Sequence, residues 1–176
     1  MTKLFPLKTC LRYPGGKSKA IKTLSPWFPD NFSEYREPFI GGGSVAIHVT
    51  QANPGIPVWI NDLYVPLYNF WVQLRDNGEE LSELVTEHKT KVSDFATQDS
   101  KDAAHRELFN QCRENIDKQE GLEKAVSFFI LNKCSFSGLT ENSTFSVTAS
   151  RSNFSFVGAA KLKEYSKIIS NWKITN

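Results

Sequence analysis

The sequence predicts an α/β fold with a parallel sheet, because strand-like and helix-like segments alternate along its first half. Residues 35–40 and 57–62 are short, largely apolar segments with the length and composition of buried strands. The glycines at 41–43 separate the first of these strands from a helical segment that Ser44 can cap. Apolar residues spaced about 3.6 residues apart in 63–74 predict a second helix. Such a βαβα unit is the start of a parallel sheet.

Helices are expected to dominate the rest of the chain. All eight prolines lie at or before Pro66, so residues that break helices are confined to the first part of the sequence. Amphipathic and apolar patterns predict helices over residues 79–91, 101–116, 121–133 and 159–170. A loop rich in Ser, Thr and Asn is expected over 135–155, and a third strand over 172–176. Three parallel strands cannot cover their own edges, so we expect an incomplete sheet.

This order of elements divides the chain into three parts. We expect residues 1–75 to form the N-terminal part of an α/β domain, 76–158 an inserted helical subdomain, and 159–176 the return of the chain to the α/β domain. Because the return ends with the third strand, the sequence reads as the N-terminal portion of a longer domain. A truncated protein and one half of a split protein both fit that expectation.

Composition places the chain among water-soluble, single-domain proteins. Of its 176 residues, 40% are hydrophobic and 23% are charged. No apolar run approaches the roughly 20 residues that a membrane span needs, and we see no apolar stretch typical of a secretory signal. Cys10, Cys112 and Cys134 have the spacing of neither a metal-binding pair nor a disulfide framework. We therefore expect a cytoplasmic protein with buried thiols and no membrane partner.

Charge is distributed unevenly, although the net charge is only +2. The first 29 residues carry six basic residues and no acid, and after Glu141 five basic residues accompany a single acid, Glu164. Two basic ends could line an anion-binding face, such as one that contacts nucleic acid. Charge alone leaves open the alternative that these residues form solvated helix surfaces.

Two glycine-rich segments predict a ligand site. Residues 37–44 lie between a strand and a helix, where the backbone can approach a cofactor, and their spacing favours a mononucleoside over a dinucleotide. Asp62 ends the next strand, where it can accept hydrogen bonds from ribose hydroxyls, cap the following helix, or do both. Residues 12–18 are not a P-loop, because Leu11 occupies the position of the required glycine. The remaining tight turn could hold a carboxylate or the edge of an adenine.

Taken in order, four segments resemble those of the Dam-type (D12 class) N6-adenine-specific DNA methyltransferases. They are residues 12–17, similar to the N-terminal cofactor motif, 36–45, similar to the glycine motif, 59–62, similar to the acidic strand end, and 128–138, similar to the stretch that leads into the target-recognition hairpin. Read alone, 131–138 is simply the end of a helix. The resemblance implies an incomplete Rossmann-like, S-adenosylmethionine-dependent methyltransferase sheet, in which 76–158 is the target-recognition subdomain.

The same resemblance implies S-adenosylmethionine as the cofactor and double-stranded DNA as the substrate. The residues that would bind the cofactor are Tyr13, Lys17, Phe39, Gly41 and Asp62. The residues that would face DNA are Lys133, Ser137, Asn142 and Arg151. Members of the family flip the target adenine out of the duplex, because N6 cannot meet a methyl donor inside the base stack.

The sequence departs from the family at the catalytic motif, which is Asp-Pro-Pro-Tyr or a close variant. The chain has no Pro-Pro pair, so no catalytic residue is assigned. His48, His88 and His105 lack ligand spacing, so no metal site is assigned either. We expect the chain to be inactive alone and to need a C-terminal partner that carries the motif. Two alternatives stay open: a non-catalytic remnant that binds cofactor or DNA, and, on the glycine turn alone, a nicotinamide oxidoreductase fragment.

Overall fold

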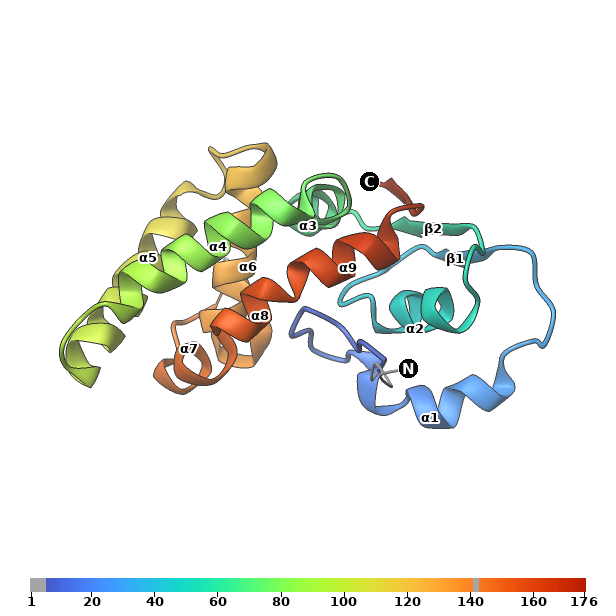
Figure 1. Ribbon diagram of the computed structural model, residues 1–176, viewed down its shortest axis with the longest axis horizontal. Helices are drawn as coiled ribbons and strands as arrows, with labels where there is room; N and C mark the ends of the chain where they lie inside the picture. The colour runs from blue at the N-terminus through green and yellow to red at the C-terminus, as the bar shows by residue number, and fades with distance from the viewer. Residues whose placement is uncertain (1–5, 141–142) are drawn as a thin grey trace.

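The computed structural model describes residues 6–140 and 143–176 and has an α/β architecture (Figure 1). A three-stranded parallel sheet lies at one end of the molecule, and a group of longer helices lies at the other. The strands are β1 (Tyr35–Glu37), β2 (Val58–Asn61) and β3 (Lys173–Thr175), in the spatial order β1-β2-β3. Tyr35 is in register with Val58, and Ile60 with Ile174. The α/β prediction, with its small parallel sheet, is confirmed.

The helices account for most of the described residues. The α-helices are α1 (Ile21–Leu24), α2 (Ser44–Ala52), α3 (Val65–Asp76), α4 (Gly78–Ser93), α5 (Gln98–Asn115), α6 (Gly121–Cys134), α7 (Val147–Asn153), α8 (Phe156–Ala160) and α9 (Leu162–Ile169). Short 3₁₀-helices are η1 (Lys17–Lys19), η2 (Ser25–Trp27) and η3 (Phe136–Gly138). The helices predicted between residues 79 and 133 are confirmed, with ends shifted by at most three residues.

The polar segment 135–155 is not a loop throughout, which corrects the sequence prediction. It contains η3 and α7, and α7 begins after Ser146, whose hydroxyl accepts a hydrogen bond from the Ala149 N–H at 3.2 Å. The helix predicted over 159–170 is in fact two helices, and the first of them begins after Ser155, which caps it in the same way. Serine caps start both helices, and helices this short give no clear periodic pattern in the sequence.

Two helix starts also differ from the prediction. Gly43, not Ser44, is the N-cap of α2, and Ser44 is a buried residue of the first turn. Helix α3 begins at Val65 because Pro66 occupies its first turn, where the missing proline N–H costs nothing. Leu63 therefore precedes the helix and is 75% exposed, so its inclusion in the apolar helical pattern was wrong.

The whole helical part of the chain lies between the central strand β2 and the strand β3 that pairs with it. The chain leaves β2 through α3, passes through α4 to α8, and returns along α9 to β3 (Figure 1). Strand β2 is thus paired on one side with β1, which is close in sequence, and on the other with β3, which follows the entire helical part. The domain limits 1–75, 76–158 and 159–176 stay a prediction.

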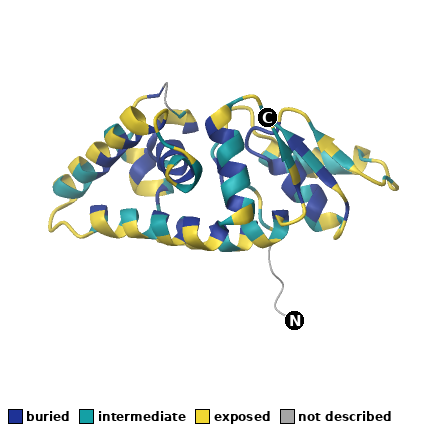
Figure 2. Cartoon of the chain, turned by 90° about the horizontal axis from the view of Figure 1, so that it is seen from above, coloured by how far each residue is buried: buried dark blue, intermediate teal, exposed yellow. Residues whose placement is uncertain are grey.

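A continuous apolar core joins the sheet to the helical part. The rings of Trp71 in α3 and Trp172 beside β3 lie 5.8 Å apart, and Phe70 stacks on Phe129 of α6 with centroids 6.0 Å apart. The Trp172 indole N–H donates to the Thr50 hydroxyl of α2 at 2.9 Å. Figure 2 shows the buried residues on the inward sides of the helices and in the sheet. Because this core is shared, the structure does not set the helical part apart as a separately packed subdomain.

The cysteines are buried, as predicted, and form no disulfides. Burial raises the pKa of Cys10 to about 12 and that of Cys112 to about 11, so these thiols are neutral. Within residues 6–140 and 143–176, no helix is long and apolar enough to cross a membrane. The same residues contain no cluster of His, Cys, Asp and Glu that could hold a metal ion.

Candidate cofactor pocket and nucleic-acid interface

The two glycine-rich segments identified in the sequence face each other across a cavity. The cavity measures about 410 Å³ and is lined by residues 13–17 and by most of residues 37–44. One wall is the turn before η1, and the other is the turn that connects β1 to α2. This is the carboxyl edge of the sheet, where ligands of α/β proteins bind. Of the five residues predicted to bind a cofactor, Tyr13, Lys17, Phe39 and Gly41 line this cavity.

The ring of Tyr13 lies directly on the glycine turn. A Cβ atom added to Gly41 would lie 2.7 Å from the Tyr13 ring, and one added to Gly42 would lie 2.8 Å from the Tyr13 Cβ. Gly41 also has a φ of +49°, in the left-handed region. The turn therefore needs glycine both for its backbone conformation and for the close approach of the aromatic ring.

Polar contacts anchor this turn on several sides. The Gly43 N–H donates to the Ile40 carbonyl at 2.9 Å and closes the turn. The Trp71 indole N–H donates to the Gly41 carbonyl at 3.2 Å, and the Thr9 hydroxyl donates to the Gly42 carbonyl. The turn is thus held by groups from the N-terminal segment and from α3.

Asp62 contacts the glycine turn that lines the cavity, although it is not itself among the lining residues. One oxygen of its carboxylate accepts the Gly41 N–H at 3.1 Å, and the other accepts the Tyr64 N–H at 3.1 Å. The N-cap of α3 is Tyr64, so Asp62 acts through a side-chain turn just before the helix rather than as its N-cap. Its negative charge lies close enough to Tyr13 to add to the effect of burial, which is the larger cause of the raised pKa of that phenol.

Phe39 and Lys17 stand at the mouth of the cavity. The Phe39 side chain is 78% exposed although it is a large aromatic group. Lys17 is exposed as well, and its ammonium donates to the Gly15 carbonyl at 2.8 Å. An exposed ring and a cation beside one polar cavity are groups that a ligand with a flat base and an anionic end could cover.

Glu37 lines the cavity too, and the sequence reasoning did not single it out. It ends β1, and the Tyr35 phenol donates to its Oε2 at 3.1 Å. Burial is the main cause that raises the pKa of Glu37, while hydrogen bonds from Tyr35 and from the Ala46 N–H act in the opposite direction. The sequence did indicate a role for Glu37, because this acid begins the glycine-rich segment 37–44 at the end of a predicted strand.

A second cavity adjoins the first, and both are lined by Tyr13 and Pro14. It measures about 270 Å³ and is lined by Tyr13, Pro14, Tyr64, Phe128, Gly138, Leu139 and Thr140. Its walls are mostly aromatic and apolar, and the Tyr64 and Phe128 centroids lie 6.2 Å apart. The hydroxyls of two lining residues, Tyr64 and Thr140, are hydrogen-bonded to each other at 2.8 Å.

The segment after α6 reverses its direction next to the second cavity. Ser135 forms an antiparallel bridge with Phe145, and the Phe136 N–H donates to the Thr144 carbonyl at 3.0 Å. Ser137, predicted to face DNA, is exposed in η3 with a φ of +56°. Asn142, predicted for the same role, lies outside the described residues. The described arms of this segment have the antiparallel course of a hairpin.

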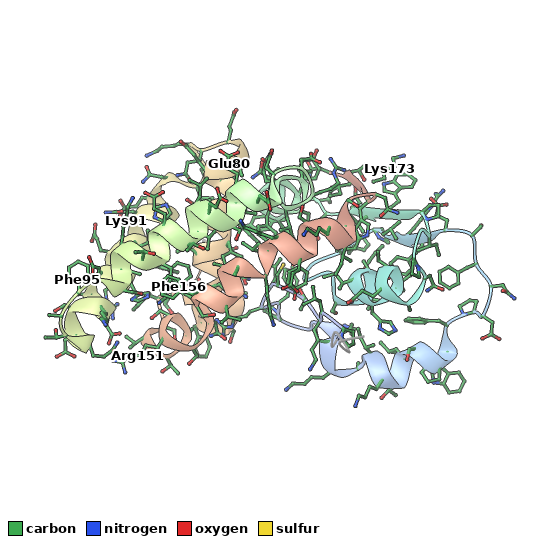
Figure 3. All side chains as sticks on the ribbon, viewed as in Figure 1. Glu80, Lys91, Phe95, Arg151, Phe156 and Lys173 are labelled. Atoms are coloured by element: carbon green, nitrogen blue, oxygen red, sulfur yellow. The ribbon has the colours of Figure 1, made fainter. Side chains whose placement is uncertain are left out.

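The other two residues predicted to face DNA lie elsewhere. The Lys133 ammonium donates to the Cys10 carbonyl and lies 5.1 Å from the centroid of Phe129, and burial lowers its pKa. Arg151 is on α7, and its Nε donates to Asp102 of α5 at 3.0 Å. Figure 3 shows Arg151 on the outer side of the helical part, at the opposite end from Lys173 and the sheet. Lys133 and Arg151 are thus both held by other protein groups, and the contacts of Lys133, Ser137 and Arg151 with DNA stay a prediction.

The D12 class N6 adenine-specific DNA methyltransferases match residues 13–176, which include both cavities. The chain belongs to this family. Membership in the D12 class replaces the nicotinamide oxidoreductase alternative.

Individual relatives agree with this assignment to the D12 class. The chain is 28% identical over 134 residues, 76% of its length, to "Type II methyltransferase M1.LlaDCHI" of Lactococcus lactis subsp. cremoris and covers 43% of that protein. It is 24% identical over 181 aligned positions, 96% of its length, to "Type II methyltransferase M.MjaIII" of Methanocaldococcus jannaschii and covers 61% of it. A phage P1 "DNA N-6-adenine-methyltransferase" is 28% identical over 76% of the chain, which covers 16% of that protein. The chain thus spans less than two thirds of each of these relatives.

Proposed function

We propose that this chain carries the S-adenosylmethionine site of an enzyme that methylates N6 of adenine in double-stranded DNA. The observation that supports this most strongly is the cavity of about 410 Å³ in which residues 13–17 meet residues 37–44. Small-molecule sites typically measure about 300 to 1,000 Å³, so the cavity is large enough for a nucleoside cofactor. Its glycine walls and its place at the carboxyl edge of the sheet favour the same kind of ligand.

The groups around the cavity suit the parts of S-adenosylmethionine. Asp62 can accept hydrogen bonds from the ribose hydroxyls, because each carboxylate oxygen has a lone pair beyond the one that its backbone partner uses. Tyr13 and Phe39 offer ring faces to the adenine. Glu37 can pair with the amino group, and Lys17 with the carboxylate, of the methionine portion. When bound, the cofactor supplies an electrophilic methyl group.

The second cavity suits the target base. A base in a duplex must leave the stack before its exocyclic amine can react, and flipped bases bind between aromatic and apolar side chains. The cavity of about 270 Å³ offers such walls from Tyr13, Tyr64 and Phe128. Because it shares Tyr13 with the first cavity, a base held there lies next to the cofactor site. We therefore place the extruded adenine in the second cavity.

Exposed basic residues near the cavities suit the phosphates of the flanking DNA. Lys19 and Lys22 are exposed on η1 and α1, directly after the turn that lines both cavities. Ser137 is exposed on the segment beside the second cavity and can contact base edges or phosphates. Lys133 and Arg151 are held by other protein groups, so the proposed DNA contacts do not include them.

The proposal assigns no proton acceptor for N6 to this chain. Residues 1–176 contain no Asp-Pro-Pro-Tyr sequence, and preorganised acceptors are usually a large part of the catalytic effect. The comparisons lend no support to a separate partner fragment, and we do not propose one. The roles given to the residues of both cavities are binding and orientation.

Asp62 provides the most selective test of the cofactor site. We expect Asp62→Ala to weaken S-adenosylmethionine binding about tenfold or more, because a hydrogen bond to a charged group contributes about 1.5 to 3 kcal/mol. Isothermal titration calorimetry of the full chain measures the effect. Asp94→Ala, which removes an exposed acid at the end of α4, is the matched control and should bind like the wild type. Equal affinities for Asp62→Ala and the wild type would show that the cofactor lies elsewhere.

A protein that binds cofactor and DNA without chemistry is the second candidate, because the roles given to the residues of both cavities are binding and orientation. Such a protein would bind DNA with an affinity that falls steeply as salt rises, because Lys and Arg contacts to phosphates release counterions. It would bind S-adenosylmethionine but transfer no methyl group. A methyl-transfer assay with tritiated S-adenosylmethionine and adenine-containing duplex DNA tests for chemistry directly, and label incorporated into DNA by this chain would rule out the binding-only candidate.

A further inference from the structure

Asn132 occupies an unusual place at the end of α6. It is fully buried in the last turn of α6, directly after the apolar residues Phe128, Phe129, Ile130 and Leu131. Its Oδ1 accepts the Arg12 N–H at 2.9 Å, and its Nδ2 donates to the Arg12 carbonyl at 2.7 Å and to the Gly138 carbonyl at 2.9 Å. The amide orientation is fixed by these partners, since only this orientation pairs an oxygen with the N–H and a nitrogen with the two carbonyls.

Further contacts connect Arg12 to the segment that follows α6. The Arg12 guanidinium donates to the Ser135 carbonyl at 2.8 Å. Gly138 lies so close to Arg12 that a Cβ added to it would be 2.5 Å from the Arg12 Cβ and from the Arg12 carbonyl oxygen. The residue after Arg12 is Tyr13, whose ring lies on Gly41 in the cofactor cavity. Arg12 therefore connects the wall of the cofactor cavity to the segment that follows α6.

We propose that Asn132 is a positioning residue that couples the cofactor cavity to segment 135–140. The inference rests on the proposed function, since it concerns how the site for S-adenosylmethionine communicates with the segment proposed to meet DNA. Asn132 lines neither cavity, so it acts only through the Arg12 backbone on one side and Gly138 on the other. A ligand that fixes Tyr13 restrains Arg12, and through Asn132 it restrains segment 135–140. By reciprocity, DNA that fixes this segment favours the same position of Tyr13.

The buried amide makes this coupling sensitive to substitution. Asn132→Ala leaves the Arg12 N–H and two carbonyls without their partner in a site closed to water, and such groups move to find other partners. Movement of Arg12 shifts Tyr13 relative to Gly41. The expected result is weaker cofactor binding by about tenfold, and loss of the response of cofactor binding to DNA.

The experiment measures the affinity of the full chain for S-adenosylhomocysteine, which transfers no methyl group, with and without sheared double-stranded DNA at low salt. For the wild type we expect DNA to tighten binding about fivefold or more, the lower end of typical coupling between two sites. Asn132→Ala should bind more weakly and show no gain with DNA. Asn153→Ala is the matched control, because it removes a side-chain amide that bonds only within α7, to the Ala149 carbonyl. It should behave like the wild type, and circular dichroism checks that each variant is folded.

Arg12→Met gives a second test that leaves the buried amide in place. It removes only the guanidinium bond to the Ser135 carbonyl, so the protein should stay folded and the gain with DNA should shrink. If the wild type binds no S-adenosylhomocysteine, the proposed function itself is wrong. If the wild type binds it and DNA has no effect, or if Asn132→Ala and Arg12→Met keep the full gain, the coupling is refuted while the cofactor site stands.

Discussion

At Tyr13 the two cavities meet. Its ring forms a wall of the cavity assigned to the cofactor and of the cavity assigned to the base, and it packs on Gly41. Burial raises the pKa of its phenol, with a smaller contribution from the Asp62 carboxylate, so the phenol is protonated at neutral pH. A neutral aromatic ring held against a glycine turn suits stacking and exclusion of water.

Gly41→Ala tests whether this ring position matters for binding. The added methyl group would meet the Tyr13 ring at 2.7 Å, so the ring must move out of place. We expect S-adenosylmethionine binding, measured by calorimetry, to weaken about tenfold or more. The free energy of unfolding should fall by about 1 to 3 kcal/mol, because alanine at a φ of +49° is strained.

Gly55→Ala is the matched control for this substitution. Gly55 has a φ of +87°, but an added Cβ would meet no atom within 4 Å. The variant should lose comparable stability, measured by urea denaturation, and keep the wild-type affinity for S-adenosylmethionine. A loss of affinity in both variants would attribute the effect of Gly41→Ala to general destabilisation and not to Tyr13.

Single residues show where sequence reasoning succeeds and where it fails. The glycines of 41–43 were recognisable, because few other reasons place three glycines between a strand and a helix. The direction of the Lys133 side chain could not be predicted. The residue type at a helix end does not tell whether its side chain points to solvent or to a buried group such as the Cys10 carbonyl. Asn132 gave a signal that was missed: a polar side chain that ends the most apolar run needs partners inside the protein.

At the level of elements, α6 and the segment after it form the link between the sheet and the helical part. Helix α6 packs on α3 through Phe70 and Phe129, and Asn132 in its last turn is hydrogen-bonded to Arg12 and Gly138. The strands and the long helices were predictable because burial gives them clear apolar patterns. Helix α7 was not, because its start depends on one serine cap and its length is only seven residues.

The contact between α5 and α7 should depend on pH. Hydrogen bonds from Arg151 are the main cause that lowers the pKa of Asp102 from 3.8 to about 2. The ionised carboxylate therefore stabilises the fold above its unfolded pKa, and this contribution is lost as the pH falls towards 2. We expect Asp102→Asn to lower the melting temperature slightly at pH 7, by an amount that shrinks between pH 4 and pH 2.

The exposed acid Asp94 supplies the comparison for this experiment. Asp94→Asn should change the melting temperature little at any pH, since Asp94 ends α4 on the surface. Added salt should reduce the effect of Asp102→Asn, because exposed charge pairs are screened. A difference between wild type and Asp102→Asn that stays constant from pH 7 to pH 2 would show that the ion pair does not link the helices.

On the scale of the whole molecule, one apolar core supports both the glycine turn of the cofactor cavity and the helical part of the chain. Trp71 packs under the glycine turn at Gly43 and also contacts Trp172 beside the returning strand. The α/β class, the parallel sheet and the late third strand were all predictable from local patterns. The shared core was not, because packing between segments far apart in sequence leaves no mark on either segment alone.

The most direct measurement is photo-crosslinking of radiolabelled S-adenosylmethionine to the full chain, followed by peptide mapping. Tyr13 and Phe39 offer aromatic rings at the cofactor cavity, so the label should appear on peptides that contain residues 13–17 or 37–44. Unlabelled S-adenosylhomocysteine should compete the label away, and Asp62→Ala should reduce it. Label that maps to other peptides, or no competable label on the folded protein, would contradict the assignment of this cavity to S-adenosylmethionine.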